Sequence, residues 1–315
     1  METIKYNKEN TPNAAKLMES LRYSGYDNNI AISDLIDNSL DANAININVE
    51  ISLDSKRESY IIIADDGIGM DEETLGQALR LGSVTHRNIE SDLGRFGMGM
   101  VTASISIAKR IEVFTKQQGR PMLTSIMDLD EMAKNNNFNV YREKSTSEEI
   151  KFAQRCGIGD SGTILALKKC DKLTKPGLIE FTDSLKKDIG ETYRYFLRSG
   201  KKIMVNGELV EIIDPMWTDG ALTEEYKQKS EIFSDERYEI KIDGIDKKET
   251  FAVKIYVLPK FDQVIMRKLK IGIRNQGFYV LRNYRQISKS DELGGIWNKD
   301  PHLNNIRAEI IKKRL

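Results

Sequence analysis

The chain has 315 residues, of which 40% are hydrophobic and 30% are charged, and it contains only six prolines. This composition is typical of a folded globular protein and excludes a fibrous or largely disordered chain. Because a domain usually holds roughly 100–200 residues, the length predicts two domains, which we place at residues 1–174 and 175–315. No run approaches the ~20 apolar residues that span a bilayer, and the first residues lack the apolar core of a signal peptide. We therefore expect a cytoplasmic protein that contacts no membrane.

Two cysteines and two histidines are too few and too scattered for a structural zinc site or a disulfide framework. We interpret Cys156 and Cys170 as small apolar residues. The formal net charge of zero conceals an asymmetry: residues 1–100 carry 9 Lys and Arg against 17 Asp and Glu, a net charge of −8, whereas residues 265–315 carry 12 against 4, a net charge of +8. The basic end could neutralise the phosphates of a nucleotide or of DNA, or it could be an ordinary solvated surface.

In the first half of the chain, segments with helical spacing of apolar residues alternate with strand-like segments. In chain order the spacing predicts a helix beginning at Thr11-Pro12, a helix at 29–42, strands at 45–51 and 60–64, a helix at 71–81, a loop at 82–97, a helix at 98–108, and strands at 110–115, 122–128 and 162–169. Residues 129–160 are polar and weakly patterned, and we expect an irregular excursion there.

The second half carries its clearest signal at Asn206-Gly207, because an Asn-Gly pair between two apolar runs is typical of a β-hairpin. The elements predicted around it are a helix at 177–198, hairpin strands at 201–205 and 208–213, strands at 236–242, 250–257 and 277–282, and a helix at 261–269.

The first segment that indicates chemistry is Asp34 to Asp41. Asp34, Asn38 and Asp41 share one helical stripe through i,i+4 and i,i+3 spacing. A carboxylate one turn before a carboxamide can hold an attacking water beside Mg²⁺, an ion that takes one or two protein oxygens and fills its remaining positions with phosphate and water. A solvated polar face is the alternative interpretation.

The second segment, Asp65-Asp66-Gly67-Ile68-Gly69-Met70, follows an apolar strand. Its glycines would let a ligand approach the backbone, and a carboxylate at a strand end can accept a hydrogen bond from an adenine amine. A tight Asp-Gly turn is the alternative.

The third segment runs from Gly94 to Met100 and joins a loop to a helix start. Backbone N–H groups at such a start bind anions such as phosphate, and glycine lets them come close. No Gly-Lys-Ser/Thr sequence follows, so the segment is not a Walker A loop.

In this order the three segments resemble the N-box and the two glycine boxes of the Bergerat ATP-binding fold, which defines the GHKL family. Residues 34–42 look like the N-box of MutL and MORC proteins, residues 65–70 like the glycine box of Hsp-ninety chaperones, and Gly162-Thr163-Ile164 like the family's late Gly-Thr strand. The resemblance implies an α+β fold, in which a Bergerat α/β sandwich ATPase domain is followed by a transducer-like α/β domain. Relatives usually continue beyond the end of this sequence, which suggests a fragment of a longer protein.

The resemblance also implies roles for individual residues. Asn38 would bind Mg²⁺, Asp65 would hold the adenine amine of ATP, and Thr163 would support Asp65 through water. Gly67 and Gly69 would make room for the base and Met70 would pack against it, while residues 82–95 would form a mobile lid. The residues implied to surround the phosphates are Gly94, Arg95, Phe96, Gly97, Met98 and Gly99.

Two implied catalytic residues depart from the family pattern. Asp34 stands where most relatives have the glutamate that acts as general base, and because aspartate is one methylene shorter we expect slow hydrolysis. A transducer lysine reaches the γ-phosphate in the family, and Lys299 is the matching candidate. The MORC pattern points instead towards Asn304, and a solvated surface lysine is a further alternative.

The function that fits best is Mg-dependent ATP hydrolysis that drives homodimerisation of a molecular clamp. The alternative is an ATP-gated module that binds DNA or a partner protein with negligible turnover. A histidine kinase fits less well, because such kinases usually lack a base at the Asp34 position and this sequence shows no helical hairpin with a phosphoacceptor histidine.

Overall fold

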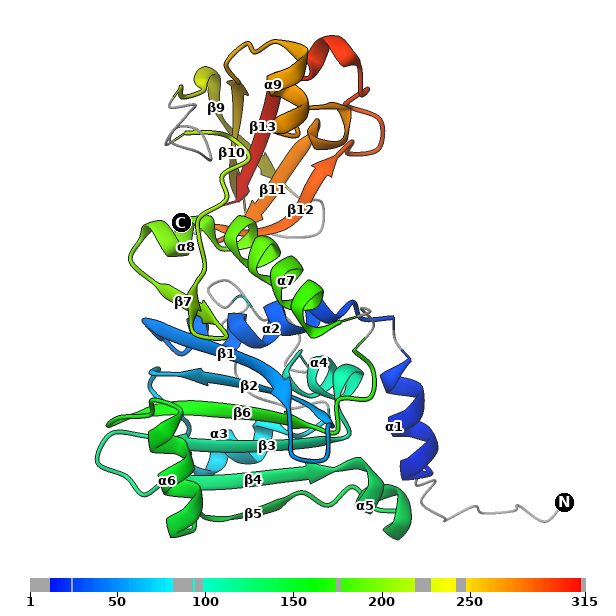
Figure 1. Cartoon of the computed structure of the whole chain (residues 1–315), viewed down its shortest axis with the longest axis vertical. Coiled ribbons are helices and arrows are strands. Elements are labelled where there is room, and N and C mark those ends of the chain that lie inside the picture. The colour runs from blue at the N-terminus through cyan, green and yellow to red at the C-terminus, as the bar shows by residue number, and fades with distance from the viewer. Residues whose placement is uncertain are drawn as a thin grey trace, which may run out of the picture. The chain divides into compact units, whose positions relative to one another are not determined.

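The computed structural model describes residues 12–23, 25–81, 93, 99–173, 177–218, 228–241 and 248–312. The chain divides into two compact units, one of Met1–His86 with Phe96–Leu178 and one of Arg87–Arg95 with Ile179–Leu315. Each unit combines helices with a sheet (Figure 1), which confirms the predicted α+β class. No helix in these described ranges is long and apolar enough to cross a bilayer.

Six antiparallel strands of the first unit lie in the order β5-β4-β3-β6-β2-β1. Their bounds are β1 Asn46–Leu53, β2 Ser59–Asp65, β3 Arg110–Lys116, β4 Leu123–Asp128, β5 Tyr141–Lys144 and β6 Gly162–Lys168. Side chains alternate between the two faces of a strand. Odd-numbered residues of β2, such as Ile63, therefore share one face, and even-numbered residues such as Ala64 share the other.

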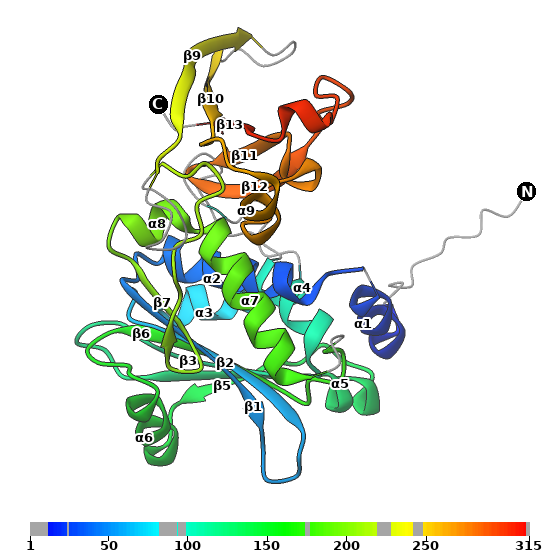
Figure 2. The ribbon, with the colours of Figure 1, turned by 45° about the horizontal axis from the view of Figure 1, so that its top comes forward.

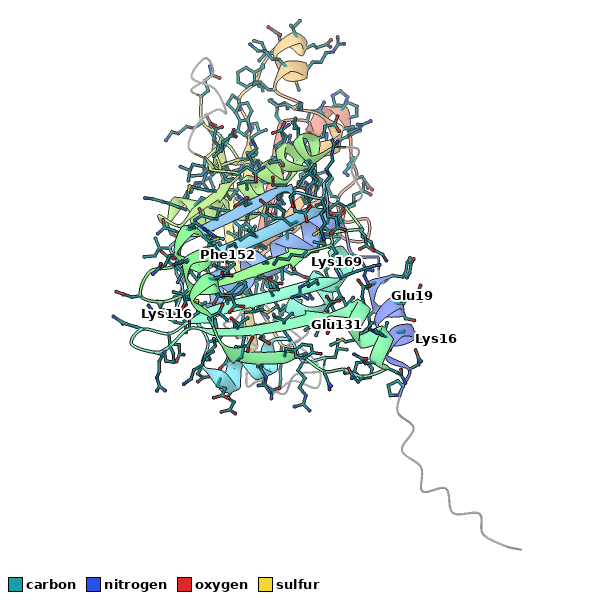
Figure 3. The ribbon with its side chains drawn as sticks, turned by 60° about the horizontal axis from the view of Figure 1, so that its bottom comes forward. Lys16, Glu19, Lys116, Glu131, Phe152 and Lys169 are labelled. Atoms are coloured by element: carbon teal, nitrogen blue, oxygen red, sulfur yellow. The ribbon has the colours of Figure 1, made fainter. Side chains whose placement is uncertain are left out.

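Helices cover one face of this sheet (Figure 2), the face opposite to the one on which Ala64 packs. They are α1 Ala14–Arg22, α2 Asn28–Asp41, α3 Glu72–Ala78 and α4 Gly99–Ile107, with α2 packed on α4. On the opposite face α6, Ser147–Arg155, packs its buried Ala153 against Ala64 and Phe114. Figure 3 shows this opposite face, with Phe152 and Lys169 towards different ends.

Two predictions for the first unit were wrong. The first helix begins at Ala14, because Asn13 caps it by accepting a hydrogen bond from the Lys16 N–H at 3.0 Å. The supposedly irregular stretch contains α5 Leu129–Asn135, β5 and α6. A capping box at α6, formed by Thr146 and Glu149, was a readable signal that the low apolar content obscured.

The second unit begins with α7 Leu178–Thr192 and α8 Arg194–Arg198, where the sequence predicted a single helix. The hairpin of β7 Lys202–Val205 and β8 Glu208–Leu209 follows, although β8 is shorter than predicted. Asn206 and Gly207 both have positive φ, 50° and 79°, as a type I′ hairpin turn requires.

A five-stranded sheet with order β12-β11-β13-β10-β9 completes the second unit. Its elements are β9 Glu231–Lys241, β10 Lys248–Val257, α9 Gln263–Lys268, η1 Ile273–Asn275, β11 Phe278–Arg282, β12 Arg285–Asp291, η2 Pro301–Leu303 and β13 Ile306–Lys312. β11 and β13 are parallel and the other neighbours are antiparallel. The sequence analysis missed β12 and β13, whose charged residues interrupt the apolar alternation.

Candidate nucleotide-binding site

Helix α2 is buried nearly all round. From Ala31 to Asp41 the side chains that keep partial exposure are Asp34, Asn38 and Asp41, while the remaining ones are buried. The predicted stripe is therefore the partly exposed face of this stretch of helix. A merely solvated helix face is a poorer explanation, because the helix lies in the core rather than on the surface.

Asp34 and Asn38 are held in place within the stripe. The Asn38 side-chain amide donates a hydrogen bond to the Asp34 carbonyl at 3.1 Å. The Tyr26 hydroxyl donates a hydrogen bond to Oδ2 of Asp34 at 2.9 Å. The sequence analysis did not identify Tyr26, because it precedes the helix and belongs to none of the three motifs.

Asp65 lies at the end of β2, on the helix-covered face of the sheet. Strand register places Asp65 opposite Thr163 of β6, and Thr163 opposite Thr115 of β3. Three polar side chains thus share one rung of three neighbouring strands, and all three are buried.

The Asp65 carboxylate is partly satisfied by the protein. Its Oδ2 accepts a hydrogen bond from the Ser39 hydroxyl at 2.8 Å, and its Oδ1 accepts one from the Gly67 N–H at 2.9 Å. Burial nevertheless raises the pKa of Asp65 above its usual value, although hydrogen bonds from Gly67, Ser39 and Thr163 act in the other direction. A buried carboxylate of this kind gains from a further donor, such as the amine of an adenine.

Thr115 connects the glycine box to Thr163, and the sequence analysis did not single it out. Its hydroxyl lies 3.0 Å from the Thr163 hydroxyl and accepts a hydrogen bond from the Met70 N–H at 2.8 Å. Only the strand register could have found it, because Thr115 is far from Thr163 in sequence.

Gly67 and Gly69 are both required by the protein itself. A Cβ at Gly67 would lie 2.8 Å from the Cβ of Ala42, at the end of α2. Gly69 has a φ of +69°, and a Cβ there would lie 2.0 Å from the Lys116 carbonyl oxygen. These contacts explain the glycines without a ligand, so space for a nucleotide base remains a prediction.

Of the other predicted residues, the structure describes Gly99, Lys299 and Asn304. Gly94, Arg95, Phe96, Gly97 and Met98 lie outside the described residues, as does the predicted lid apart from Leu93. Gly99 is the first residue of α4. In the second unit the Lys299 ammonium pairs with Glu292 at 3.4 Å, and Asn304 accepts a hydrogen bond from Gln276 at 2.7 Å.

Magnesium would have to be held largely by the nucleotide. Among the described residues no group of three or more His, Cys, Asp and Glu could hold a metal ion. The Asn38 carboxamide and the neighbouring Asp34 offer the oxygen donors that Mg²⁺ prefers, and the ion usually completes its shell with phosphate oxygens and water. The donor set therefore fits a metal that arrives with ATP rather than a resident one.

Known protein sequences match the segment that contains these candidate site residues. Residues 26–163 match the profile of the family described as histidine kinase-, DNA gyrase B-, and HSP90-like ATPase. These residues are therefore similar to a GHKL-type ATPase domain. The match contains the α2 stripe, Asp65 and Thr163.

Three curated relatives are similar over the ATPase domain. Protein MICRORCHIDIA 5 of Arabidopsis thaliana is 30% identical over 94 residues, which are 28% of this chain and 13% of the relative. ATPase morc-1 of Caenorhabditis elegans is 29% identical over 89 residues, 28% of this chain and 10% of the relative. ATPase MORC2B of Mus musculus is 33% identical over 91 residues, 28% of this chain and 9% of the relative. The chain thus matches about a tenth of each relative's length, and the matched segment is similar to these MORC proteins.

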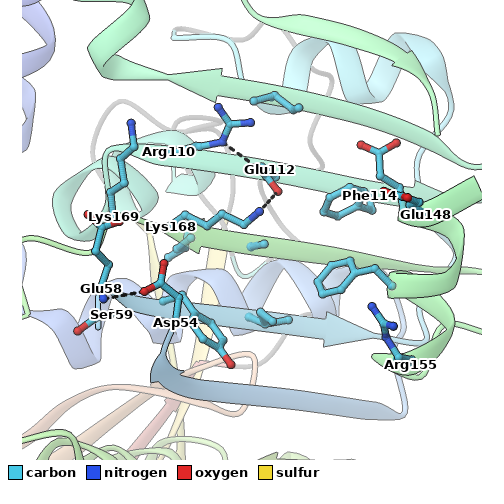
Figure 4. Close-up of a pocket in the computed structure, with 17 residues that line it drawn as sticks. Asp54, Glu58, Ser59, Arg110, Glu112, Phe114, Glu148, Arg155, Lys168 and Lys169 are labelled. Carbon is cyan, nitrogen blue, oxygen red and sulfur yellow. Dashed lines mark hydrogen bonds and ion pairs between the residues drawn. The ribbon is translucent and has the colours of Figure 1, made fainter. Parts of the chain in front are cut away.

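A separate cavity of about 740 Å³ lies on the other face of the first unit's sheet (Figure 4). Its buried Glu112 pairs with Arg110 at 2.7 Å and with Lys168 at 2.6 Å. Phe114 and Phe152 meet edge to face in another part of the wall. Because its Arg110, Lys168 and Lys169 are paired with protein carboxylates and the motif residues lie on the opposite face, this cavity is not the candidate nucleotide site.

The basic end of the sequence does not form a uniform cationic surface. Lys289 pairs with Asp188 at 3.4 Å and Lys312 pairs with Glu249 at 3.0 Å, while Arg307 is buried. Their acidic partners lie outside residues 265–315, so folding neutralises part of the charge excess seen in the sequence.

Proposed function

We propose that the first unit binds ATP with Mg²⁺ and hydrolyses it. The observation that carries the proposal is the partly exposed stripe that contains Asp34 and Asn38, on a helix whose other side chains are buried from Ala31 onwards, in a unit that also holds the buried Asp65. The buried carboxylate can accept a hydrogen bond from the amine of a nucleotide base. A carboxylate beside a carboxamide can hold a metal-bound phosphate chain together with the attacking water.

Each residue then has a distinct task. Asp65 accepts a hydrogen bond from the adenine amine, and the Ser39 hydroxyl and the Thr163 backbone keep it oriented. Asn38 contributes a carboxamide oxygen to Mg²⁺, which when bound neutralises phosphate charge. Asp34 takes a proton from the water that attacks the γ-phosphate. Turnover is slow, because the aspartate reaches less far than a glutamate would.

The test separates binding from hydrolysis. Asp34→Asn should lower kcat at least about a hundredfold while the affinity for a fluorescent ATP analogue stays within about threefold, because only proton transfer is removed. Asp41→Asn on the same stripe is the matched control, with kcat changed less than about threefold. Hydrolysis by Asp34→Asn at the parental rate would show that another group is the base.

The same proposal extends to a cytoplasmic, ATP-driven clamp that homodimerises. ATP can favour a closed dimer only if the nucleotide interacts more strongly with that state than with the open one. The second unit would act as the transducer, with Lys299 leaving Glu292 to approach the γ-phosphate. Sedimentation velocity with a non-hydrolysable ATP analogue should show a dimer, and a monomer at saturating analogue would rule the clamp out.

A further inference from the structure

Tyr26 lies two residues before the start of α2, and its side chain extends along the helix to Asp34. Asp27 caps the helix by accepting hydrogen bonds from the Asn29 N–H at 2.8 Å and the Ile30 N–H at 3.4 Å. Gly25 has a φ of +76°, a turn conformation that glycine adopts without strain. The turn and the cap together fix the backbone position of Tyr26. Its hydroxyl donates a hydrogen bond to Oδ2 of Asp34, eight residues further along the chain.

The position of this hydroxyl matters because of what Asp34 must do. A carboxylate that takes a proton from water must be held within a fraction of an ångström of its working position. The half-buried hydrogen bond restricts the side-chain rotation of Asp34. Hydrogen bonds to charged groups are stronger than those between neutral groups, so this restraint is substantial.

We propose that Tyr26 is a positioning residue for the general base, and that its hydroxyl holds the Asp34 carboxylate in the orientation for hydrolysis. The inference rests on the proposed function of the first unit. Tyr26 acts through Asp34 and makes no demand on nucleotide binding. A purely structural bond that fastens the start of α2 would instead show itself in stability and in affinity.

The experiment compares Tyr26→Phe with Tyr23→Phe. Tyr26→Phe keeps the ring and removes the hydroxyl, and kcat should fall about ten- to a hundredfold, the effect of losing one hydrogen bond to a charged group. The dissociation constant for a fluorescent ATP analogue and the melting temperature should stay unchanged. Tyr23 is 72% exposed on the preceding helix end, and Tyr23→Phe should leave kcat unchanged.

A double-mutant cycle then identifies the group through which Tyr26 acts. In an Asp34→Asn background, followed by single-turnover hydrolysis of labelled ATP, Tyr26→Phe should change the residual rate less than about twofold. An equal fall of kcat in both backgrounds overturns the proposal, and so does a Tyr26→Phe variant that loses affinity or melts early. If the parent hydrolyses ATP and Tyr26→Phe matches it, only the positioning role fails. If the parent shows no turnover, the proposed function fails as well.

Discussion

The two units of this protein each bury a cluster of polar side chains, and the clusters differ in how they are completed. In the second unit Arg194 and Glu309 are fully buried, with an N–O distance of 2.5 Å. Glu309 also accepts hydrogen bonds from Tyr195 at 2.9 Å and from Tyr256 at 3.1 Å, and burial beside this carboxylate raises the pKa of both tyrosines. Its hydrogen-bonding groups come from α8, β10 and β13, although the buried Arg194 Nε has no hydrogen-bond partner among the described residues and lies 3.9 Å from Asp214.

The cluster of the first unit is open by comparison. The Asp65 pKa is raised by burial despite three hydrogen bonds, and the Asp34 and Asn38 side chains keep partial exposure. A buried polar group that finds its partners within the protein stabilises a fold, whereas one that still gains from a donor suits a ligand. The difference separates a structural network from a candidate site, and it predicts different consequences of substitution in the two units.

The largest effect is expected from Arg194→Met. The change leaves Glu309 buried without its cation, and loss of one partner of such a pair costs about 3–5 kcal/mol of the free energy of unfolding. Lys254→Met, which removes the more exposed pair with Asp235, should cost less than about 1 kcal/mol. Urea unfolding followed by tryptophan fluorescence reports on this unit, since Trp217 and Trp297 are the two tryptophans. Equal losses in both variants would refute the distinction.

Asp65→Asn should weaken ATP binding about a hundredfold, because the neutral amide is a weaker acceptor of the hydrogen bond from the adenine amine than the charged carboxylate is.

Asp65→Asn should also raise the melting temperature at neutral pH. Burial raises the folded-state pKa of Asp65, so its contribution to stability is complete below the unfolded-state pKa and is lost as the pH rises through the folded-state value. The gain of the variant should therefore shrink towards acidic pH. Calorimetry at pH 4 and pH 7.5 measures this, and a variant less stable than the parent at pH 7.5 would contradict it.

Gly69→Ala tests whether packing inside the protein requires a glycine at this position of the glycine box. Gly69 and Gly119 have φ of +69° and +72°, but a Cβ meets the Lys116 carbonyl only at Gly69, and nothing lies within 4 Å at Gly119. Both variants bear the strain of a left-handed residue, about 1 kcal/mol. Gly69→Ala adds a clash of about 2 kcal/mol. Thermal unfolding followed by circular dichroism compares the two variants. Equal melting temperatures would show that the backbone near Lys116 moves aside without loss of stability.

The smallest functional effect is expected at Cys170. Burial raises the pKa of its thiol to about 12, so the reactive thiolate is scarce at neutral pH. Cys170 should therefore react with a thiol reagent at least about a hundredfold faster in urea than in the native protein, and Cys170→Ala should leave ATP turnover within about twofold. Rapid native labelling at Cys170, assigned by mass spectrometry, would show that the sequence-based apolar interpretation of this residue is wrong.

Local patterns in the sequence were enough to predict the helix of Asp34 and Asn38, the strand that ends at Asp65, and the order of the motifs. These features depend on local spacing: apolar residues at helical intervals, alternation in a strand, and an Asn-Gly pair at a turn. The sequence did not reveal the structure in residues 129–160 or the strands β12 and β13, because their charged residues are stabilised by contacts with other segments rather than by a local apolar pattern.

Only the tertiary structure decided which polar residues meet. Thr115 and Thr163 are 48 positions apart and become neighbours through strand register. Tyr26 reaches Asp34 because a turn and a helix cap direct it there, and the basic end of the chain is partly neutralised by acids from other segments. Spacing along a chain predicts which face of an element a residue occupies, whereas the partner of that face depends on how the elements pack.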